Sequence, residues 1–364
     1  MHMADALLSP AVGGTMWAAS AGIIAYCSKK VRQELDDKKV PLMGVLGAFI
    51  FAAQMINFTI PVTGSSGHLG GGLILTILLG PYAAFLTIAS VLVVQALFFA
   101  DGGILALGCN IFNLGFFPAF IAYPFIYKKL IGIRQAPTRM SIASIVAAII
   151  GLQMGAFGVV LETVFSGVSS LPFSTFVLMM QPIHLAIGVV EGLVTASVIS
   201  FVYKARPEIM QSAIEARPIG NYPVRNVVLG FLAVALVTGG FVSWFASKNP
   251  DGLEWSITKV TGQEELKGPE QGLHGALTAL QEKIAFLPDY SFRKPAETKK
   301  EATKPEAVQA HQTAQQEQKP EEKKAEEPKN PVGTSVAGLV GGTLTLGLAL
   351  VIGFILKRKS NGLT

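Results

Sequence analysis

The sequence is poor in cysteine and in charge. Cys27 and Cys109 are its only cysteines, and both lie inside apolar stretches, so neither a disulfide framework nor a thiolate metal cluster is expected. Asp, Glu, Lys and Arg together make up 15% of the chain. The G-x-x-x-x-G-K-[ST] phosphate loop and the H-E-x-x-H zinc-protease motif are both absent. The sequence therefore predicts neither an ATPase nor a protease of these kinds, and no permanent cofactor.

Long apolar runs are the main feature that is present. Hydrophobic residues make up 51% of the 364 residues, and the mean hydropathy is +0.49. Several runs approach about 20 residues, the length that crosses the hydrocarbon of a bilayer. The sequence predicts an all-α integral protein of the cell (plasma) membrane. The net charge of +5 would suit nucleic acid, but the basic residues form short clusters between apolar runs, so no nucleic-acid partner is expected.

Basic clusters predict the orientation in the membrane. They lie near 29–39, 128–139, 204–225 and 357–359. The loops near 61–72, 100–103 and 166–175 contain no Lys or Arg. Because basic loops stay in the cytoplasm, we expect the N-terminus outside and the C-terminus in the cytoplasm.

The apolar runs predict seven helices and then two more. The first seven cover about 10–28, 41–60, 69–80, 82–100, 104–127, 140–165 and 175–203, and the last two cover about 227–246 and 334–356. The Gly80-Pro81 pair should separate the third helix from the fourth. The third is too short to span alone, so it should lie against protein or line a cavity.

These helices divide into a metal-binding transmembrane core at 1–206, a cytoplasmic connector at 207–226 and a two-helix module at 227–364. Within the module, residues 249–292 hold enough apolar side chains for a small external folded or helical element. Residues 293–331 are almost all Lys, Glu, Pro, Ala and Gln, and such a composition predicts a disordered linker.

The N-terminus carries a specific chemical signal. No Lys or Arg precedes Lys29, so we expect the first helix to be retained rather than removed as a signal peptide, and the bulky His2 should keep Met1 in place. The α-amine of Met1, the amide nitrogen of residue 2 and Nδ1 of His2 can then close a five-membered and a six-membered chelate ring on one metal ion.

A fourth nitrogen would complete a square-planar site, which nickel(II) and copper(II) favour, and nitrogen donors also suit cobalt. His68 is the candidate, because it lies in a glycine-rich outward loop on the side of the N-terminus. Asp5 and Ser66 are polar neighbours that could support the ligands. The alternative is that His2 belongs to an exposed terminus and His68 to an ordinary loop.

Three ionisable residues lie within the predicted spans, where charge is costly. They are Glu162, His184 and Glu191, the last two being two turns apart on one helix. They could serve the substrate, or they could bond across helices and fix the packing. The same packing role suits Asn110, Asn113 and Gln95.

Small residues recur at helical spacing, as at Ala18, Gly22 and Ala25 of the first helix and at Gly188 and Gly192 of the seventh. Small side chains let helices approach closely. The spacing suits internal packing or a partner helix equally.

Four segments resemble one family, the CbiM/NikM substrate-capture components of energy-coupling-factor (ECF) importers for cobalt and nickel. They are M-H-M-A-D-A-L-L-S-P at 1–10, T-G-S-S-G-H-L at 63–69, G-C-N-I-F-N at 108–113 and P-I-H-L-A-I-G-V-V-E-G at 182–192. The P-D-G-L-E at 250–254 is similar to the signature of the CbiN/NikN accessory proteins. The chain therefore resembles a fusion of the two components.

This resemblance implies an ECF S-component-like core of seven helices and a metal ligand set of Met1, His2 and His68. It also implies two kinds of partner, a transmembrane coupling protein that meets the Ala18, Gly22 and Ala25 face, and a cytoplasmic ATPase pair. The imported nickel(II) or cobalt(II) would supply nickel enzymes or cobalamin synthesis. The extended linker at 293–331 departs from the compact accessory protein.

Two other functions remain open from the residues alone. One is a membrane metal receptor or sensor, in which 249–292 reports occupancy. The other is a membrane enzyme that uses His184 and Glu191, although no nucleophile or activated-water arrangement accompanies them. The residues also leave nickel and cobalt undecided, and a nitrogen square plane favours nickel.

Overall fold

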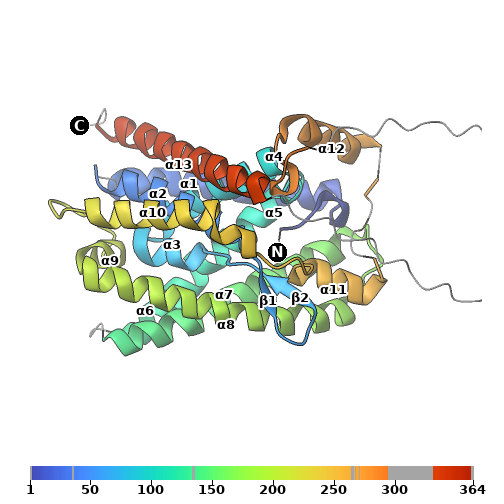
Figure 1. The fold of residues 1–364 in the computed structure, drawn as a ribbon, viewed down its shortest axis with the longest axis horizontal. Coiled ribbons are helices and arrows are strands. Elements are labelled where there is room, and N and C mark those ends of the chain that lie inside the picture. Colours follow the sequence, from blue (N-terminus) through green and yellow to red (C-terminus); the bar gives the residue numbers. More distant parts are fainter. Residues whose placement is uncertain are drawn as a thin grey trace, which may run out of the picture.

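The chain is mostly helical, with its helices arranged along one long axis (Figure 1). The computed structural model describes residues 2–34, 37–132, 136–263, 266, 268–269, 271–293 and 331–361. Five helices are long and apolar enough to cross a membrane, namely Pro81–Phe99, Leu107–Ile131, Pro137–Ser166, Phe173–Ala205 and Pro331–Arg358. These helices confirm the prediction of a helical protein with several membrane-crossing segments. The first helix is not among the five, because Gly, Ser and Thr dilute its apolar residues.

A short turn and four helices form the first part of the chain. They are η1 (Asp5–Leu7), α1 (Pro10–Glu34), α2 (Lys39–Gln54), α3 (Gly72–Leu79) and α4 (Pro81–Phe99). The predicted break between α3 and α4 falls at Gly80, whose φ is +81°. Pro81 then begins α4 at a position where its missing N–H costs no hydrogen bond. Every residue of α3 is buried, as expected for a helix that lies within the protein.

The segment after α2 differs from its prediction. The predicted helix at 41–60 was wrong beyond Gln54, because β1 (Phe58–Ile60) pairs antiparallel with β2 (Ser65–Gly67). Pro61 explains the difference, since the residue before a proline is driven out of the helical region. The hairpin turn contains Gly64 at a φ of +74°, and His68 follows β2 directly.

The next helices complete the part of the chain that ends near residue 205. They are α5 (Leu107–Ile111), a π-helical stretch η2 (Phe112–Tyr127), α6 (Lys128–Ile131), α7 (Pro137–Ser166) and α8 (Phe173–Ala205). Two glycines of α8 bring it against α7. A Cβ added at Gly188 would lie 3.1 Å from Cα of Ile149, and one at Gly192 would lie 2.7 Å from Cα of Ile145. These small residues therefore serve packing within the chain.

The C-terminal part contains the two predicted helices, α10 and α13, together with short elements that the sequence did not locate one by one. They are α9 (Pro207–Ile214), α10 (Arg225–Gly240), η3 (Val242–Phe245), α11 (Gly252–Thr261), α12 (Gly272–Ile284), η4 (Pro288–Tyr290) and α13 (Pro331–Asn361). Helices α10 and α13 pack against α2 and cross each other at Gly239 and Gly338. The expected helical element at 249–292 consists of α11, α12 and η4. The predicted linker at 293–331 lies, except for its two end residues, outside the described residues.

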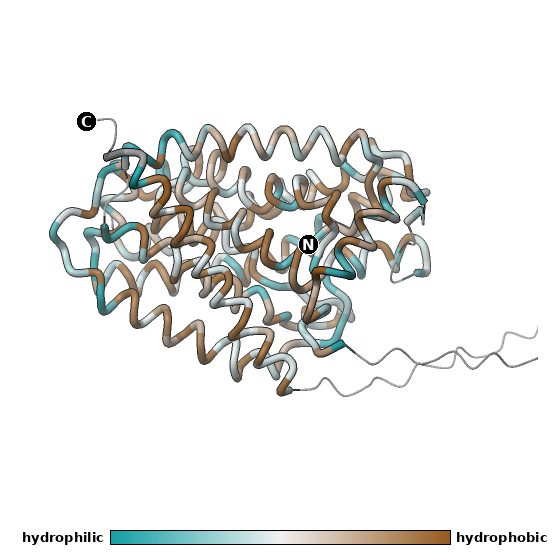
Figure 2. Tube along the Cα trace, turned by 90° about the horizontal axis from the view of Figure 1, so that it is seen from above, coloured by the Kyte–Doolittle hydropathy of each residue, from teal (hydrophilic) through white to brown (hydrophobic). Residues whose placement is uncertain are grey.

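Basic residues from separate parts of the chain meet at one end of the molecule. Lys38 donates from Nζ to the carbonyl of Gly220 at 2.6 Å, and Lys128 donates to the carbonyl of Ile214 at 3.1 Å, so separate basic clusters meet at one end. The hairpin, the N-terminus, α11 and α12 lie toward the opposite end (Figure 1). Hydrophobic residues follow the helices between the ends, and hydrophilic ones gather in the terminal turns (Figure 2).

Candidate metal centre

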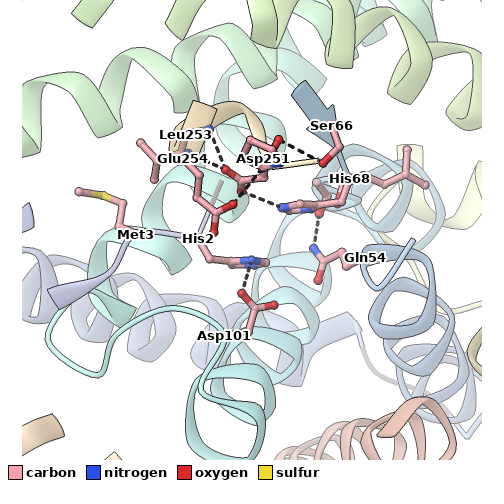
Figure 3. A network of polar contacts seen from close by, with 12 residues as sticks. His2, Met3, Gln54, Ser66, His68, Asp101, Asp251, Leu253 and Glu254 are labelled. Atoms are coloured by element: carbon pink, nitrogen blue, oxygen red, sulfur yellow. Dashed lines mark hydrogen bonds and ion pairs between the residues drawn. The ribbon is translucent and has the colours of Figure 1, made fainter. Parts of the chain in front are cut away.

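The fold brings together the two histidines that the sequence singled out. The imidazole rings of His2 and His68 stack with centroids 4.9 Å apart and planes 4° from parallel. Their side chains are 6% and 7% exposed, so the site is enclosed (Figure 3). His2 is therefore not part of an exposed terminus. Met1, the third expected ligand residue, lies outside the described residues.

Polar contacts hold the backbone beside His2. Asn110 accepts the N–H of Met3 at 2.8 Å through Oδ1 and donates to the carbonyl of Met3 at 3.3 Å. The N–H of Gly103 donates to the same carbonyl at 2.9 Å. Asp5 accepts the N–H of Ala106 at 2.9 Å. Asp5, expected near the ligands, and Asn110, expected to serve packing, thus anchor the N-terminal segment to α5 and to the loop before it.

A carboxylate from a predicted span holds the loop that carries His68. Glu191 accepts the N–H groups of Gly70 and Gly71, each at 3.0 Å. Gln54 donates to the carbonyl of Gly70 at 2.9 Å. Glu191 therefore also satisfies two N–H groups that directly precede α3. This buried glutamate acts on the backbone of the loop.

The P-D-G-L-E segment packs on the hairpin. Ser66 donates its N–H to the carbonyl of Pro250 and its hydroxyl to the carbonyl of Asn249, both at 2.8 Å. Trp255 donates from Nε1 to the carbonyl of Thr63 at 3.0 Å. Ser66, expected as a neighbour of the metal ligands, thus joins the hairpin to the C-terminal module.

Asp251 connects that module to His68. Its Oδ1 accepts the N–H groups of Leu253 and Glu254, which together with the Glu254 side chain forms a capping box at the start of α11. Its Oδ2 lies 3.9 Å from Nε2 of His68 (Figure 3). The P-D-G-L-E motif was noticed in the sequence, but nothing in the sequence indicated that Asp251 lies beside His68.

The protonation state of His68 suits a ligand. Its Nδ1 lies 3.1 Å from the carbonyl of Leu69, and an N–H on Nδ1 would leave the lone pair on Nε2. Burial, helped by the charge of the neighbouring His2, lowers the pKa of His68 to about 3. The ring is therefore neutral near pH 7, the form that binds metal ions.

Asp101, which the sequence did not single out, contacts His2, and Tyr290 contacts Asp101. Nδ1 of His2 lies 3.0 Å from Oδ1 of Asp101, and the hydroxyl of Tyr290 donates to Oδ2 of Asp101. Burial by itself would raise the pKa of Asp101, but the charge of His2 and hydrogen bonds from His2 and Tyr290 hold it well below its usual range. Asp101 could have been noticed as a lone acid beside Gly102-Gly103 in a loop without basic residues.

The remaining buried ionisable residues contact neighbouring helices or their own backbone. Glu162 accepts a hydrogen bond from Asn113 at 2.7 Å, which joins α7 to η2. Nδ1 of His184 lies 2.8 Å from the carbonyl of Met180. Its Nε2 is buried without a hydrogen-bond partner among the described residues and faces Gly252. These contacts match the packing role for Glu162.

A cavity of about 840 Å³ opens beside the two histidines, between the core and the α11–α12 segment. Its described lining contains six carboxylates and no Lys or Arg. They are Asp5, Asp101, Asp251, Glu254, Glu282 and Asp289. Acidic walls of this kind raise the local concentration of cations. In the described part of the chain, no three His, Cys, Asp or Glu side chains form a metal cluster.

Comparison with known proteins decides the family. The CbiM family, described as the cobalt uptake substrate-specific transmembrane region, matches residues 2–209. This chain belongs to the CbiM family. The PDGLE domain matches residues 225–358, so a CbiM region is fused to a PDGLE domain in one chain. The resemblance noted from the sequence is confirmed.

Two relatives and one solved structure support the CbiM assignment. The fused nickel transport protein NikMN of Rhodobacter capsulatus is 30% identical over 316 residues, which cover 80% of this chain and 88% of that protein. The cobalt transport protein CbiM of Geobacter sulfurreducens is 26% identical over 286 residues, covering 75% of this chain and 81% of that protein. The crystal structure of a truncated transition metal transporter superposes with a TM-score of 0.51 and 30% identity, covering 56% of this chain and 99% of the other.

The small-residue face of α1 in the CbiM region points away from the protein. Ala18, Gly22 and Ala25 are all exposed. A Cβ added at Gly22 would meet no atom within 4 Å among the described residues. This face is therefore available to another helix.

Proposed function

We propose that this chain is the substrate-capture component of an ECF-type importer for nickel(II) or cobalt(II). The ligands are the Met1 amine, the amide and imidazole of His2, and Nε2 of His68. The stacking of His2 on His68 carries the proposal, because two buried imidazoles lie together beside an acidic cavity. The metal is the transported substrate and is used in nickel enzymes or in cobalamin synthesis.

The ligand set makes binding depend on pH. The α-amine and the amide nitrogen must lose protons before they coordinate, so metal binding releases protons to solvent. Nickel affinity therefore falls as the pH drops below about 8, the ordinary pKa of an α-amine. An affinity that did not change with pH would contradict this ligand set.

The importer needs partners that this chain does not supply. The sequence carries no P-loop, so a cytoplasmic ATPase pair drives release, and a transmembrane coupling protein connects the pair to the exposed face of α1. The basic clusters that meet through Lys38 and Lys128 support a cytoplasmic position for their end of the molecule. The C-terminus then lies in the cytoplasm and the N-terminus outside.

Calorimetry with nickel(II) on the purified full chain tests the site. One added residue before Met1 moves the amine out of the chelate, and His68→Ala removes the fourth nitrogen. Each change should weaken binding more than ~100-fold, beyond the effect of losing a supporting group. Tyr222→Ala, at an exposed side chain, is the control and should bind like the wild type. Unaltered binding by the extended chain would exclude the N-terminal ligands.

Uptake measurements separate a transporter from a sensor. Vesicles that contain this chain, the coupling protein and the ATPase pair should accumulate nickel when supplied with ATP. A receptor that only reports metal occupancy would bind nickel without accumulating it. The enzyme alternative loses support because the relatives are metal transport proteins and Glu191 is engaged by the Gly70 and Gly71 amides.

A further inference from the structure

The nitrogen of His2 that the chelate requires already contacts a carboxylate. Only Nδ1 can close the six-membered ring with the amide nitrogen of residue 2. In this structure Nδ1 lies 3.0 Å from Oδ1 of Asp101, while Nε2 is buried and has no hydrogen-bond partner among the described residues. The imidazole is thus held by Asp101 in a position that differs from the metal-bound one.

Asp101 is itself fixed by the PDGLE domain. Tyr290 donates its hydroxyl to Oδ2 of Asp101 and stacks its ring on Phe99, with centroids 5.1 Å apart and planes 19° from parallel. Gln281 of α12 donates to the carbonyl of Gly102, the next residue after Asp101, at 2.7 Å. The PDGLE domain therefore contacts both the side chain and the backbone of the loop that holds His2.

The backbone at Tyr290 is specialised for this contact. Asp289 and Tyr290 have φ values of +50° and +57°, a region that residues other than glycine rarely adopt. Such conformations persist only where the surroundings enforce them, and they are common at functional sites. The turn directs the Tyr290 hydroxyl to Asp101 instead of leaving the side chain on the surface.

We propose that Asp101 and Tyr290 are positioning residues through which the PDGLE domain controls a metal ligand of the CbiM region. Asp101 accepts the Nδ1–H of His2 before metal binds. When Nδ1 turns to the metal, the proton resides on Nε2 and Asp101 accepts the Nε2–H instead. This inference rests on the proposed function, because it assigns His2 as a ligand.

The exchange has a physical basis in the contacts of His2. A buried ring nitrogen without a partner is unfavourable, and among the described residues Nε2 of His2 has none. After the exchange, Nδ1 binds metal and Nε2–H is bonded to Asp101, so both nitrogens are satisfied. A carboxylate on the far nitrogen of a metal-bound histidine also fixes the ring orientation and raises its basicity.

Nickel titration of four full-length variants tests the proposal. Asp101→Asn should weaken nickel binding by about 10–100-fold, the range for loss of a group that supports a metal ligand. Tyr290→Phe keeps the ring on Phe99 and removes only the hydroxyl. It should weaken nickel binding by about 10-fold, the lower end of that range. Tyr222→Phe is the matched control and should equal the wild type. His68→Ala reports on the metal site itself.

The readouts separate positioning from a general structural role. At saturating nickel, the ligand-field absorption band should shift in Asp101→Asn and stay unchanged in Tyr222→Phe, because only the former changes the His2 ring orientation. If Asp101→Asn does not fold, Tyr290→Phe and Asp101→Glu take its place. If Tyr290→Phe and Asp101→Asn bind nickel like the wild type while His68→Ala does not, the inference is overturned and the proposed function stands. If His68→Ala also binds normally, the proposed function itself fails.

Discussion

The carboxylate of Glu191 lies 3.0 Å from the amide nitrogen of Gly70, which places a residue of the membrane helix α8 under the loop that carries His68. Its second oxygen bonds the next amide, that of Gly71, so the loop is held at two successive positions. A carboxyl group buried in this way is tolerated because both of its oxygens accept N–H groups just before a helix. The position of His68 therefore depends on a residue that need not touch the metal.

Replacing Glu191 with glutamine should weaken both the fold and the site. Glutamine offers one oxygen acceptor, so its NH₂ group would face one of the two loop amides. An unsatisfied buried donor costs ~1–3 kcal/mol, and the loosened loop should also lower nickel affinity. Thermal unfolding and nickel titration measure the two effects. Glu215→Gln, with a side chain 51% exposed, is the control and should change neither.

Gly103→Ala should displace the N-terminal segment. A Cβ at this position would lie 1.8 Å from Oδ1 of Asp5 and 2.5 Å from the Asp5 backbone nitrogen. The clash involves backbone, so a side-chain rotation cannot relieve it, and the segment that carries His2 must move. We expect at least ~10-fold weaker nickel binding, as for lost support of a ligand.

Gly14→Ala is the matched control for this clash, because a Cβ there meets no described atom within 4 Å. Calorimetry on both variants measures the effect. Wild-type nickel affinity in Gly103→Ala would show that the N-terminal segment does not position the metal.

Acid should destabilise the metal-free protein partly through His68. In the unfolded chain the ring takes a proton near pH 6.5, whereas in the folded protein burial keeps it neutral down to about pH 3. The unfolded state therefore binds more protons in this window, and the free energy of unfolding falls as the pH drops from about 6.5 toward 3.

A comparison of variants isolates this contribution. Melting temperatures between about pH 7 and pH 5 should fall more steeply for the wild type than for His68→Gln, which has no titrating ring. Tyr222→Phe, at an exposed side chain, should follow the wild type. Equal slopes for the wild type and His68→Gln would show that His68 is not buried in its neutral form.

Enlarging the exposed face of α1 should prevent assembly without affecting capture. Gly22→Leu or Ala18→Leu places a bulky side chain where close helix approach requires a small one. The coupling protein should no longer co-purify with the chain, while nickel affinity of the isolated chain stays at the wild-type value. Ala21→Leu changes another exposed residue of α1 and tests whether the contact face extends beyond Ala18 and Gly22. Unimpaired co-purification of both variants would place the contact elsewhere.

Several local features could be predicted from the sequence because they have local causes. The Gly80-Pro81 break follows from the fixed φ of proline and is observed. The hairpin at 58–67 was missed, although Pro61 was a signal, because an apolar run reads alike as helix or strand. The small helices α11 and α12 could be anticipated only as a helical element, since short helices depend on tertiary contacts for their stability.

The sequence by itself determined that this is a multi-pass helical membrane protein of a metal-transport family, because apolar length and a motif near the N-terminus are linear properties of a chain. Only the tertiary structure decided which residues lie together around His2 and His68. Asp101 and Tyr290 are 189 residues apart, and Asp251 and His68 are almost as distant, so no periodicity relates them. Burial beside one cavity gives these pairs their significance, and burial is a property of the folded chain.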